Sequence, residues 1–453
     1  MNEIGVMKEK MKVAFQNLGC RVNEYETETM ARILKEKGFE TVPFKEGADV
    51  YIINTCTVTN IADRKSRQML HRAKKLNKDA VVIAAGCYVN INSDKLEKDS
   101  EIDILVKNDE KEKIYDIICD YFKSRREDHD NESVELSLKD TPEVNSKVRY
   151  ERCRAFLKVQ DGCNMFCTYC IIPYARGRVT SRRPEEVIEE VKNLGKKGYK
   201  EVVVSGIHIS SYGIDFPEHN KESEYNHELL ELIKAIAGIE EIKRIRLGSV
   251  EPRLMTEKFV EELSKISKLC PQFHLSLQSG CDATLKRMHR HYDTKEYYEI
   301  CCRLRSFFDG PAITTDVITG FPGETEEEFE ESYSFVKSIN FSKTHIFKYS
   351  RREGTKAASM PGQLTDREKS LRSERLISLD EENEALYAKS RAGKISEVLF
   401  EEKKEFNGKM MWHGYTREYV SAFMESEEDL TNKIIVCNAQ EAIGSSLLCT
   451  ERD

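Results

Sequence analysis

The chain of 453 residues is long enough for about three domains and a large buried core. Charged residues make up 33% and hydrophobic residues 39%, which is typical of a globular protein and excludes a disordered chain. A net charge of −8 excludes binding to nucleic acid through bulk positive charge, so any RNA binding must use local patches and shape.

Neither a membrane segment nor an export signal is expected. No apolar run approaches the roughly 20 residues of a membrane helix, and charges in residues 1–10 stand where a signal peptide needs an apolar stretch. We therefore predict a cytoplasmic enzyme. Fourteen cysteines in such a chain favour metal or redox chemistry over a disulfide framework.

Strands alternate with helices over the first predicted domain, residues 1–123. Apolar runs predict strands at 12–17, 49–54, 80–85 and 102–106, with helices at 23–37, 61–76 and up to about 122. This alternation predicts a flavodoxin-like parallel α/β sheet that is covered on both faces.

A cysteine closely follows each of the first three predicted strands: Cys20, Cys56 and Cys87. Parallel strands end at one edge of the sheet, and open α/β sheets bind ligands at that edge. A single cysteine is more often a small core residue, but three at equivalent places predict a metal site. Gly19 and Gly86 would let the backbone approach a bulky cluster.

A polar stretch at residues 124–150 is predicted to be a linker. The next predicted domain, residues 151–391, begins with a strand and a loop that contains Cys163, Cys167 and Cys170 at C-x3-C-x2-C spacing. Three thiolates this close can bind one metal centre. Zinc sites and ordinary clusters usually have a fourth ligand, and the next downstream candidate is His208.

A 4Fe–4S cluster held by three cysteines leaves one iron open, and at this spacing the open iron implies S-adenosylmethionine. The loop resembles that of the radical S-adenosylmethionine superfamily, including Tyr169 just before the last cysteine. Three buried or zinc-bound cysteines are the alternative interpretation.

Six strand–helix units predict a partial (βα)6 barrel, in which chemistry sits at the carboxyl ends of the strands. The predicted strands are 155–159, 201–205, 243–247, 273–277, 313–318 and 344–349. By resemblance to the superfamily, we expect Gly206, Gln278 and Asp316 at strand ends to contact the cofactor, and Tyr169 to lie near its adenine. An ordinary turn or barrel-mouth role is the alternative for each.

By default, no catalytic or metal-binding role is expected for the remaining cysteines or for the basic clusters. Structural roles are predicted for Cys119, Cys153, Cys270, Cys281, Cys301, Cys302, Cys437 and Cys449. Solvated surface is the default expectation for each of three basic clusters near predicted strand ends: Lys286–His291, Arg176 and Arg178 with Arg182 and Arg183, and Arg351–Arg352. Together such clusters could bring phosphates to the barrel mouth.

The last predicted domain, residues 392–453, changes to short strands at 395–400, 410–415, 419–423, 434–436 and 447–449, which predict a small antiparallel β-barrel. Its segment 414–420 resembles the RNA-binding TRAM domain. The charge does not support RNA binding here, because the stretch from Arg391 to Asp453 has 8 basic and 12 acidic residues.

The whole set of motifs resembles the radical S-adenosylmethionine methylthiotransferases. The motifs are Asn17-Leu-Gly-Cys20, Asn54-Thr-Cys56 and Gly86-Cys87, followed by the radical loop. The resemblance implies that Cys20, Cys56 and Cys87 hold an auxiliary 4Fe–4S cluster, again with one free iron. It also implies an electron donor such as flavodoxin or ferredoxin, and a sulfur source.

The implied reaction adds a methylthio group at an aromatic C–H bond that acid–base residues alone cannot open. The radical cluster passes an electron to S-adenosylmethionine and a 5′-deoxyadenosyl radical forms, while the auxiliary cluster carries a sulfide that another S-adenosylmethionine methylates. The protein supplies geometry and excludes water. Because both clusters must face the substrate, sheet and barrel are expected to pack strand end to strand end.

The branch that the sequence most resembles acts on N6-threonylcarbamoyladenosine, A37 in the tRNA anticodon loop, and gives the 2-methylthio derivative. The resemblance lies in Tyr25-Glu-Thr-Glu28, which follows the Cys20 motif, and in Gln160-Asp-Gly-Cys163. The base is expected to be splayed out of the loop. Alternatives are the isopentenyladenosine branch, the branch acting on a ribosomal-protein aspartate, and a non-catalytic iron–sulfur or zinc protein. The ribosomal branch typically has Pro-Lys where this chain has Arg21-Val22.

Overall fold

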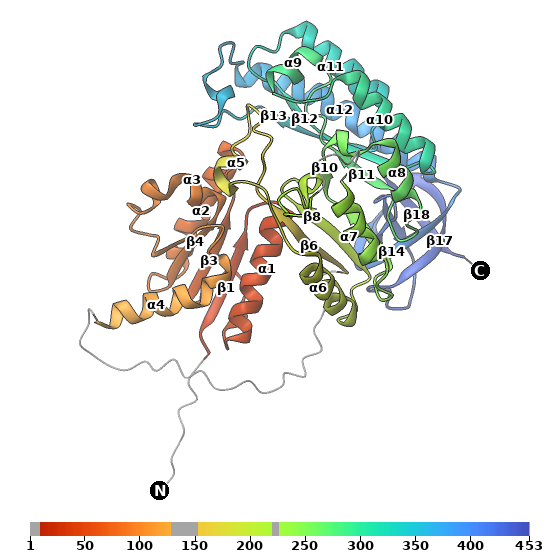
Figure 1. Ribbon diagram of the computed structural model, residues 1–453. Coiled ribbons are helices and arrows are strands. Elements are labelled where there is room, and N and C mark those ends of the chain that lie inside the picture. The colour runs from red at the N-terminus through yellow and green to blue at the C-terminus, as the bar shows by residue number, and fades with distance from the viewer. Residues whose placement is uncertain (1–9, 128–152, 220–225, 453) are drawn as a thin grey trace. The chain divides into compact units, whose positions relative to one another are not determined.

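The computed structural model describes residues 10–127, 153–219 and 226–452 (Figure 1). These residues fall into two compact units: 10–127 with Ile171–Gly177, and the rest of the described chain. Residues 128–150 of the predicted linker lie outside the described residues, and 124–127 continue helix α4 (Ile114–Glu127). No helix among the described residues has both the length and the apolar composition needed to cross a bilayer.

The sheet of the first unit is entirely parallel, with strand order β2-β1-β3-β4-β5. Its strands are β1 (Lys12–Asn17), β2 (Glu40–Val42), β3 (Val50–Thr55), β4 (Val81–Gly86) and β5 (Ile104–Val106). This is the flavodoxin-like order, so the predicted fold is confirmed. The edge strand β2 was not predicted, because three mostly exposed residues give no apolar run.

Helices cover both faces of this sheet because its central strands are apolar on both sides. The helices are α1 (Arg21–Glu36), α2 (Asn60–Leu76), α3 (Cys87–Leu96), α4 and α5 (Ile172–Arg176), with a 3₁₀ turn η1 (Lys111–Lys113). Ile52 packs in one cluster with Met30 of α1 and Ile118 of α4. Its neighbour Ile53 packs in the opposite cluster with Leu70 of α2. Alternation along one buried strand therefore specifies both layers.

The second unit contains six parallel strands that coincide with the six predicted ones. They are β6 (Arg154–Asp161), β8 (Glu201–Gly206), β9 (Arg244–Leu247), β11 (Gln272–Leu275), β12 (Ala312–Thr319) and β13 (Lys343–Lys348). Hydrogen bonds divide them into sheets β7-β6-β8-β9 and β10-β11-β12-β13, where β7 (Thr180–Ser181) and β10 (Ser249–Val250) are short additions. An isolated bridge between Ile245 and Leu269 joins the two sheets. The predicted partial barrel is thus confirmed.

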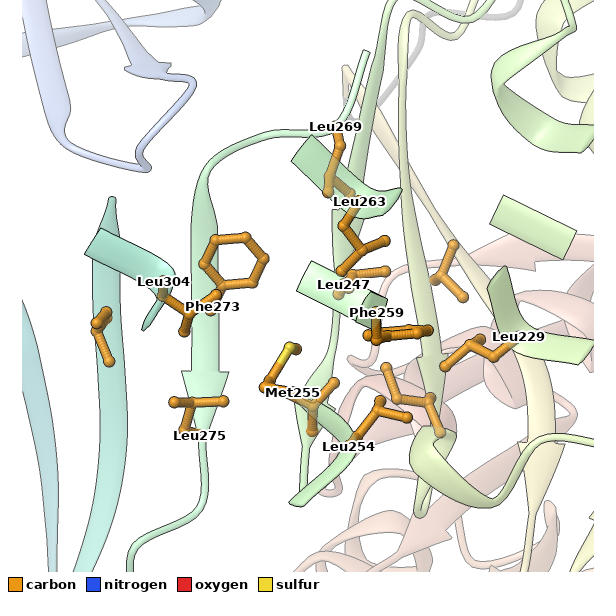
Figure 2. Packing of buried hydrophobic residues seen from close by; sticks show 14 of the residues in the cluster. Leu229, Leu247, Leu254, Met255, Phe259, Leu263, Leu269, Phe273, Leu275 and Leu304 are labelled. Carbon is orange, nitrogen blue, oxygen red and sulfur yellow. The ribbon is translucent and has the colours of Figure 1, made fainter. Parts of the chain in front are cut away.

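The barrel core lies between its strands and the surrounding helices. These are α6 (Pro184–Lys196), α7 (His227–Ala237), α8 (Glu257–Ser264), α9 (Asp282–Arg287), α10 (Thr294–Phe307), α11 (Glu326–Ile339) and α12 (Asp366–Arg391), with 3₁₀ turns η2 (Ile209–Ser211), η3 (Pro252–Leu254) and η4 (Lys356–Ser359). Figure 2 shows Phe259 and Leu263 of α8 gathered beside Leu247 of β9. Each such buried side chain contributes about 1.5–3 kcal/mol. Apolar packing on this side leaves the other strand face and the strand ends for polar groups.

The C-terminal strands form a closed barrel in the order β14-β15-β16-β18-β17. They are β14 (Ile395–Phe406), β15 (Lys409–Thr416), β16 (Ser421–Met424), β17 (Ile434–Ile443) and β18 (Ser446–Glu451). The predicted barrel is present with one correction: β16 and β18 pair in parallel, while the other pairs are antiparallel. β14 and β17 run past their predicted ends because register shifts interrupt the alternation of apolar residues.

Arginines of the central barrel hold the C-terminal barrel in the same unit. Arg246 donates to the backbone carbonyls of Arg417 and Thr416 at 2.7 and 2.8 Å. Arg244 Nε donates to a Glu397 carboxylate oxygen at 2.7 Å. These charge-assisted hydrogen bonds hold the small barrel against β9.

The TRAM-like segment 414–420 contributes to this interface. Tyr415 and Tyr419 stack with ring centroids 4.6 Å apart, and the Arg154 guanidinium lies 4.7 and 4.9 Å from the two centroids. These cation–π contacts engage the rings inside the unit. The segment therefore packs the two barrels together, a role that its resemblance to an RNA-binding motif did not predict.

A single buried carboxylate balances the arginines beneath this interface. Glu201 is 1% exposed and lies 2.8 Å from Arg246 Nε, 3.6 Å from Arg244 and 3.7 Å from Arg154. Burial alone would raise the pKa of Glu201, but the charges of Arg246 and Arg154 hold it below its ordinary value. Glu201 is therefore ionised and central to this interface.

We predict that Glu201→Gln destabilises the second unit by about 3 kcal/mol, because the buried guanidinium groups lose their shared counter-charge. Urea unfolding followed by circular dichroism measures the change. The control is Glu218→Gln, which breaks the exposed ion pair with Arg183 and should leave the unfolding midpoint almost unchanged. Equal midpoints for the two variants would contradict the role of Glu201.

Candidate functional site

Three cysteines meet at the carboxyl edge of the first unit's sheet. Cys20 directly precedes α1, Cys56 follows β3, and Cys87 is the first residue of α3. Burial raises the pKa of Cys56 to about 11, and the thiols of Cys87 and Cys20 lie close enough to raise it further. The fold thus brings together the three cysteines that the sequence singled out, next to the switch point between β1 and β3.

Among the described residues, no three His, Cys, Asp or Glu side chains are arranged to hold one metal ion. A cluster at the three cysteines stays a prediction. Iron would offset the mutual repulsion of three thiolates at one sheet edge.

Two buried asparagines form hydrogen bonds to the backbone close to the triad. Asn54 Nδ2 donates to the Asn23 carbonyl at 2.8 Å, and Asn23 Nδ2 donates to the Thr55 carbonyl at 2.9 Å. A Cβ atom on Gly86, which has φ +100°, would lie 2.6 Å from Asn54 Oδ1, and one on Gly19 would lie 2.2 Å from Asn23 Nδ2. Both glycines therefore make room for asparagines, and their approach to a cluster stays a prediction.

Two N–H donors approach the sulfur of Cys87. Arg176 Nε donates to Cys87 Sγ at 3.2 Å, and Asn108 Nδ2 lies 3.6 Å from the same atom. Arg176 also donates to the Glu26 carboxylate at 2.9 Å, and Glu26 forms a buried ion pair with Lys111. The Arg176 side chain has no exposed surface, so the expectation of a solvated basic cluster is wrong for this residue.

The second triad lies on the loop between β6 and α5. Cys167 is buried, and its carbonyl accepts a hydrogen bond from the Cys170 N–H at 3.0 Å. Burial raises the pKa of Cys163. The loop coils tightly because Gly162 (φ +69°) and Phe166 (φ +49°) take left-handed conformations. This compact loop holds three thiols near one another.

An arginine also contacts this triad. Arg290 donates to Cys167 Sγ at 3.4 Å, to the Ser276 carbonyl at 3.2 Å, and to the Tyr292 hydroxyl at 3.0 Å. The sequence assigned Arg290 to a surface cluster, and the structure places it at the barrel mouth instead. Arg352 is likewise buried. Sequence reasoning missed these residues because a basic cluster gives no sign of which arginine turns inward.

Of the residues expected to contact S-adenosylmethionine, Gly206 ends β8 and Gln278 follows β11, whereas Asp316 lies inside β12 and Tyr169 lies on the loop after β6. A Cβ atom on Gly206 would lie 2.8 Å from Gln160 Oε1. Gln278 has φ +73° and its N–H donates to the Asp316 carbonyl at 2.8 Å. The Asp316 carboxylate lies 3.2 Å from His274 Nε2. These contacts explain the local backbone, and contact with the cofactor stays a prediction.

Two further polar atoms at the barrel mouth suit a small polar ligand. Within the described chain, the buried atoms His208 Nε2 and Glu251 Oε1 have no hydrogen-bond partner. Burial lowers the pKa of His208 to about 4, so its ring is neutral at pH 7, and burial raises the pKa of Glu251. Tyr169 packs edge-on against Phe321 with centroids 6.5 Å apart. Buried groups of this kind are satisfied by water, an ion or a bound ligand.

The remaining cysteines fit their predicted structural roles. None of the 14 cysteines forms a disulfide, and six of the eight outside the triads are buried. The exceptions are Cys119, which is partly exposed, and Cys302, which is exposed on α10.

Comparison with solved structures shows the same fold elsewhere. The radical S-adenosylmethionine methyltransferase TsrM from Kitasatospora setae, solved with cobalamin and a [4Fe-4S] cluster bound, is 15% identical and has a TM-score of 0.55. The alignment covers 77% of this chain and 77% of that chain. Two family models match the sequence: the radical SAM superfamily over residues 157–336 and the uncharacterized protein family UPF0004 over residues 12–107. The radical SAM fold implies S-adenosylmethionine and a 4Fe–4S cluster.

Relatives extend over nearly the whole chain. The threonylcarbamoyladenosine tRNA methylthiotransferase MtaB of Bacillus subtilis is 40% identical and aligns over 93% of this chain and 92% of its own length. The enzyme of the same name from Aquifex aeolicus is 40% identical over 87% and 94%. A tRNA-2-methylthio-N(6)-dimethylallyladenosine synthase of Clostridium botulinum (strain Hall) is 33% identical over 95% of both chains. On this evidence the chain belongs to the radical S-adenosylmethionine tRNA methylthiotransferase family.

Proposed function

We propose that the protein adds a methylthio group at C2 of N6-threonylcarbamoyladenosine, A37 next to the tRNA anticodon. The supporting observation is the 40% identity to two relatives named for this base, against 33% to a relative named for the dimethylallyl base. The motif around Cys20 supports the same branch. The isopentenyl (dimethylallyl) base is the alternative substrate. Such an enzyme acts in the cytoplasm and needs a reductant and a sulfur source.

The two cysteine triads would hold the cofactors. Cys163, Cys167 and Cys170 would bind a 4Fe–4S cluster and, through its open iron, S-adenosylmethionine; Cys20, Cys56 and Cys87 would bind an auxiliary 4Fe–4S cluster. Reductive cleavage of S-adenosylmethionine at such a centre supplies a radical that can open an unactivated C–H bond. The proposal requires both triads to open onto one chamber, as predicted from the sequence.

The chain's own residues supply positioning and exclude water. His208 and Glu251 would hold the polar groups of S-adenosylmethionine, with Gly206, Gln278, Asp316 and Tyr169 as the expected further contacts. Arg290 fixes the orientation of Cys167 through its bonds to the Ser276 carbonyl and the Tyr292 hydroxyl. Exclusion of water from the reacting groups protects a radical from side reactions.

Mass spectrometry of tRNA nucleosides from cells with and without the gene tests the substrate. We expect deletion to remove the 2-methylthio derivative of N6-threonylcarbamoyladenosine and to leave the parent nucleoside in its place. Loss of the 2-methylthio isopentenyl nucleoside instead would establish the alternative, and an unchanged nucleoside profile would contradict both.

We predict that Cys167→Ala abolishes formation of 5′-deoxyadenosine, because the central cluster loses a ligand and the buried thiolate held by Arg290. Chromatography of the reduced, reconstituted enzyme with S-adenosylmethionine measures the product. Cys302→Ala, at an exposed cysteine on α10, is the control and should retain activity within about twofold, as expected for a surface substitution. Substantial 5′-deoxyadenosine from Cys167→Ala would refute the assignment.

We predict that Cys56→Ala leaves cleavage of S-adenosylmethionine intact but stops thiolation, because only the auxiliary site loses a ligand. Nucleoside mass spectrometry on a tRNA substrate measures thiolation, and 5′-deoxyadenosine measured in the same reaction is the internal control. A Cys56→Ala enzyme that still thiolates tRNA would remove the auxiliary cluster from the mechanism.

A further inference from the structure

Arg176 connects the two cysteine motifs in sequence. It closely follows Cys170, the last cysteine of the central motif, on the short helix α5. This helix belongs to the first compact unit, where Arg176 Nε donates to Cys87 Sγ at 3.2 Å. One short stretch of chain therefore contains a ligand candidate of one triad and a donor to a ligand candidate of the other.

Arg176 belongs to a buried group of charged side chains beside Cys87. The Glu26 carboxylate lies 2.9 and 3.1 Å from two nitrogens of Arg176 and forms an ion pair with Lys111. Exposure is 0% for the Arg176 side chain, 4% for Lys111 and 6% for Glu26. The guanidinium group of Arg176 therefore reaches the Cys87 sulfur away from water, where charge interacts more strongly than in solvent.

We propose that Arg176 is a positioning residue of the auxiliary cluster, which fixes the Cys87 ligand and raises the reduction potential of the cluster. The inference rests on the proposed function, because it needs a cluster at Cys20, Cys56 and Cys87. Hydrogen bonds to ligand sulfurs and nearby positive charge stabilise the reduced state, which carries one more negative charge. Asn108 donates to the same sulfur without charge, so it should act in the same direction more weakly.

The experiment uses the full chain with Cys163, Cys167 and Cys170 all replaced by Ala, so that only the auxiliary cluster can assemble. Iron content and an EPR-monitored redox titration are compared for this parent and for the same protein with Arg176→Met. Met removes the donor and the charge but leaves Glu26 paired with Lys111, so the fold should tolerate it. We expect the potential to fall by at least about 59 mV, a tenfold change in a one-electron equilibrium.

Two further variants complete the design. Arg32→Met removes an equal charge from an exposed i,i+4 pair with Glu36 on α1, and should leave the potential unchanged. Asn108→Ala removes the neutral donor to Cys87 together with its bond to the Ala175 carbonyl, and should lower the potential by less than Arg176→Met. Arg176→Lys keeps the charge without the guanidinium geometry and should recover part of the shift.

Each outcome decides a separate question. A parent without iron at the auxiliary site refutes the proposed second cluster itself. A parent with iron whose potential is the same in Arg176→Met, or shifts equally in Arg32→Met, overturns the role of Arg176. Should Arg176→Met lose its iron, retention of iron in Arg176→Lys with a lowered potential in Asn108→Ala supports the inference, and an unchanged potential in Asn108→Ala overturns it.

Discussion

Three thiols share one edge of the first sheet because each follows a parallel strand and parallel strands end together. This placement concentrates negative charge as soon as the thiols ionise, and the surrounding structure opposes that charge. Helix α1 begins directly after Cys20 and α3 begins at Cys87, so both cysteines stand at the positive ends of helix dipoles. Arg176 adds a guanidinium donor at Cys87. The asparagines and glycines beneath the edge then keep the strand ends in register.

Each triad has an arginine on one of its cysteines, but the two arginines have different surroundings. Arg176 shares its charge with the Glu26 carboxylate, whereas Arg290 bonds to the neutral carbonyl of Ser276. Lys111 pairs with the same Glu26 carboxylate, so each of the two cysteines keeps a cation beside its sulfur.

The sequence predicts the parts of this molecule whose signal is local. The six main strands of the barrel contain enough apolar residues, and the cysteines carry their own spacing, so both could be located without a structure. Strand β2 and the inward turn of Arg176 could not be. A three-residue edge strand is specified by its partner β1, and the burial of Arg176 depends on Glu26, which lies far away in the sequence. The same holds for Gly86, where glycine is required because Asn54 on the neighbouring strand leaves no room for a Cβ atom. A site that depends only on residue type and spacing can be predicted from the sequence, whereas a site that depends on a partner far away in the sequence cannot.

For recognition of tRNA, the resemblance of segment 414–420 to an RNA-binding motif disagrees with the packing of that segment and with the charge of its barrel. The segment around Tyr415 and Tyr419 resembles an RNA-binding motif, yet Arg154 covers both rings and Glu201 anchors the arginines around them. Its barrel is rich in acidic residues, and the chain has a net charge of −8. Few phosphates can then be neutralised, and affinity for RNA falls less steeply with salt when fewer counterions are released. Discrimination in such a complex comes mainly from the shape of the anticodon loop and from the pocket that accepts the splayed base. The small barrel therefore stabilises the central barrel through the two stacked tyrosines and the arginines around them.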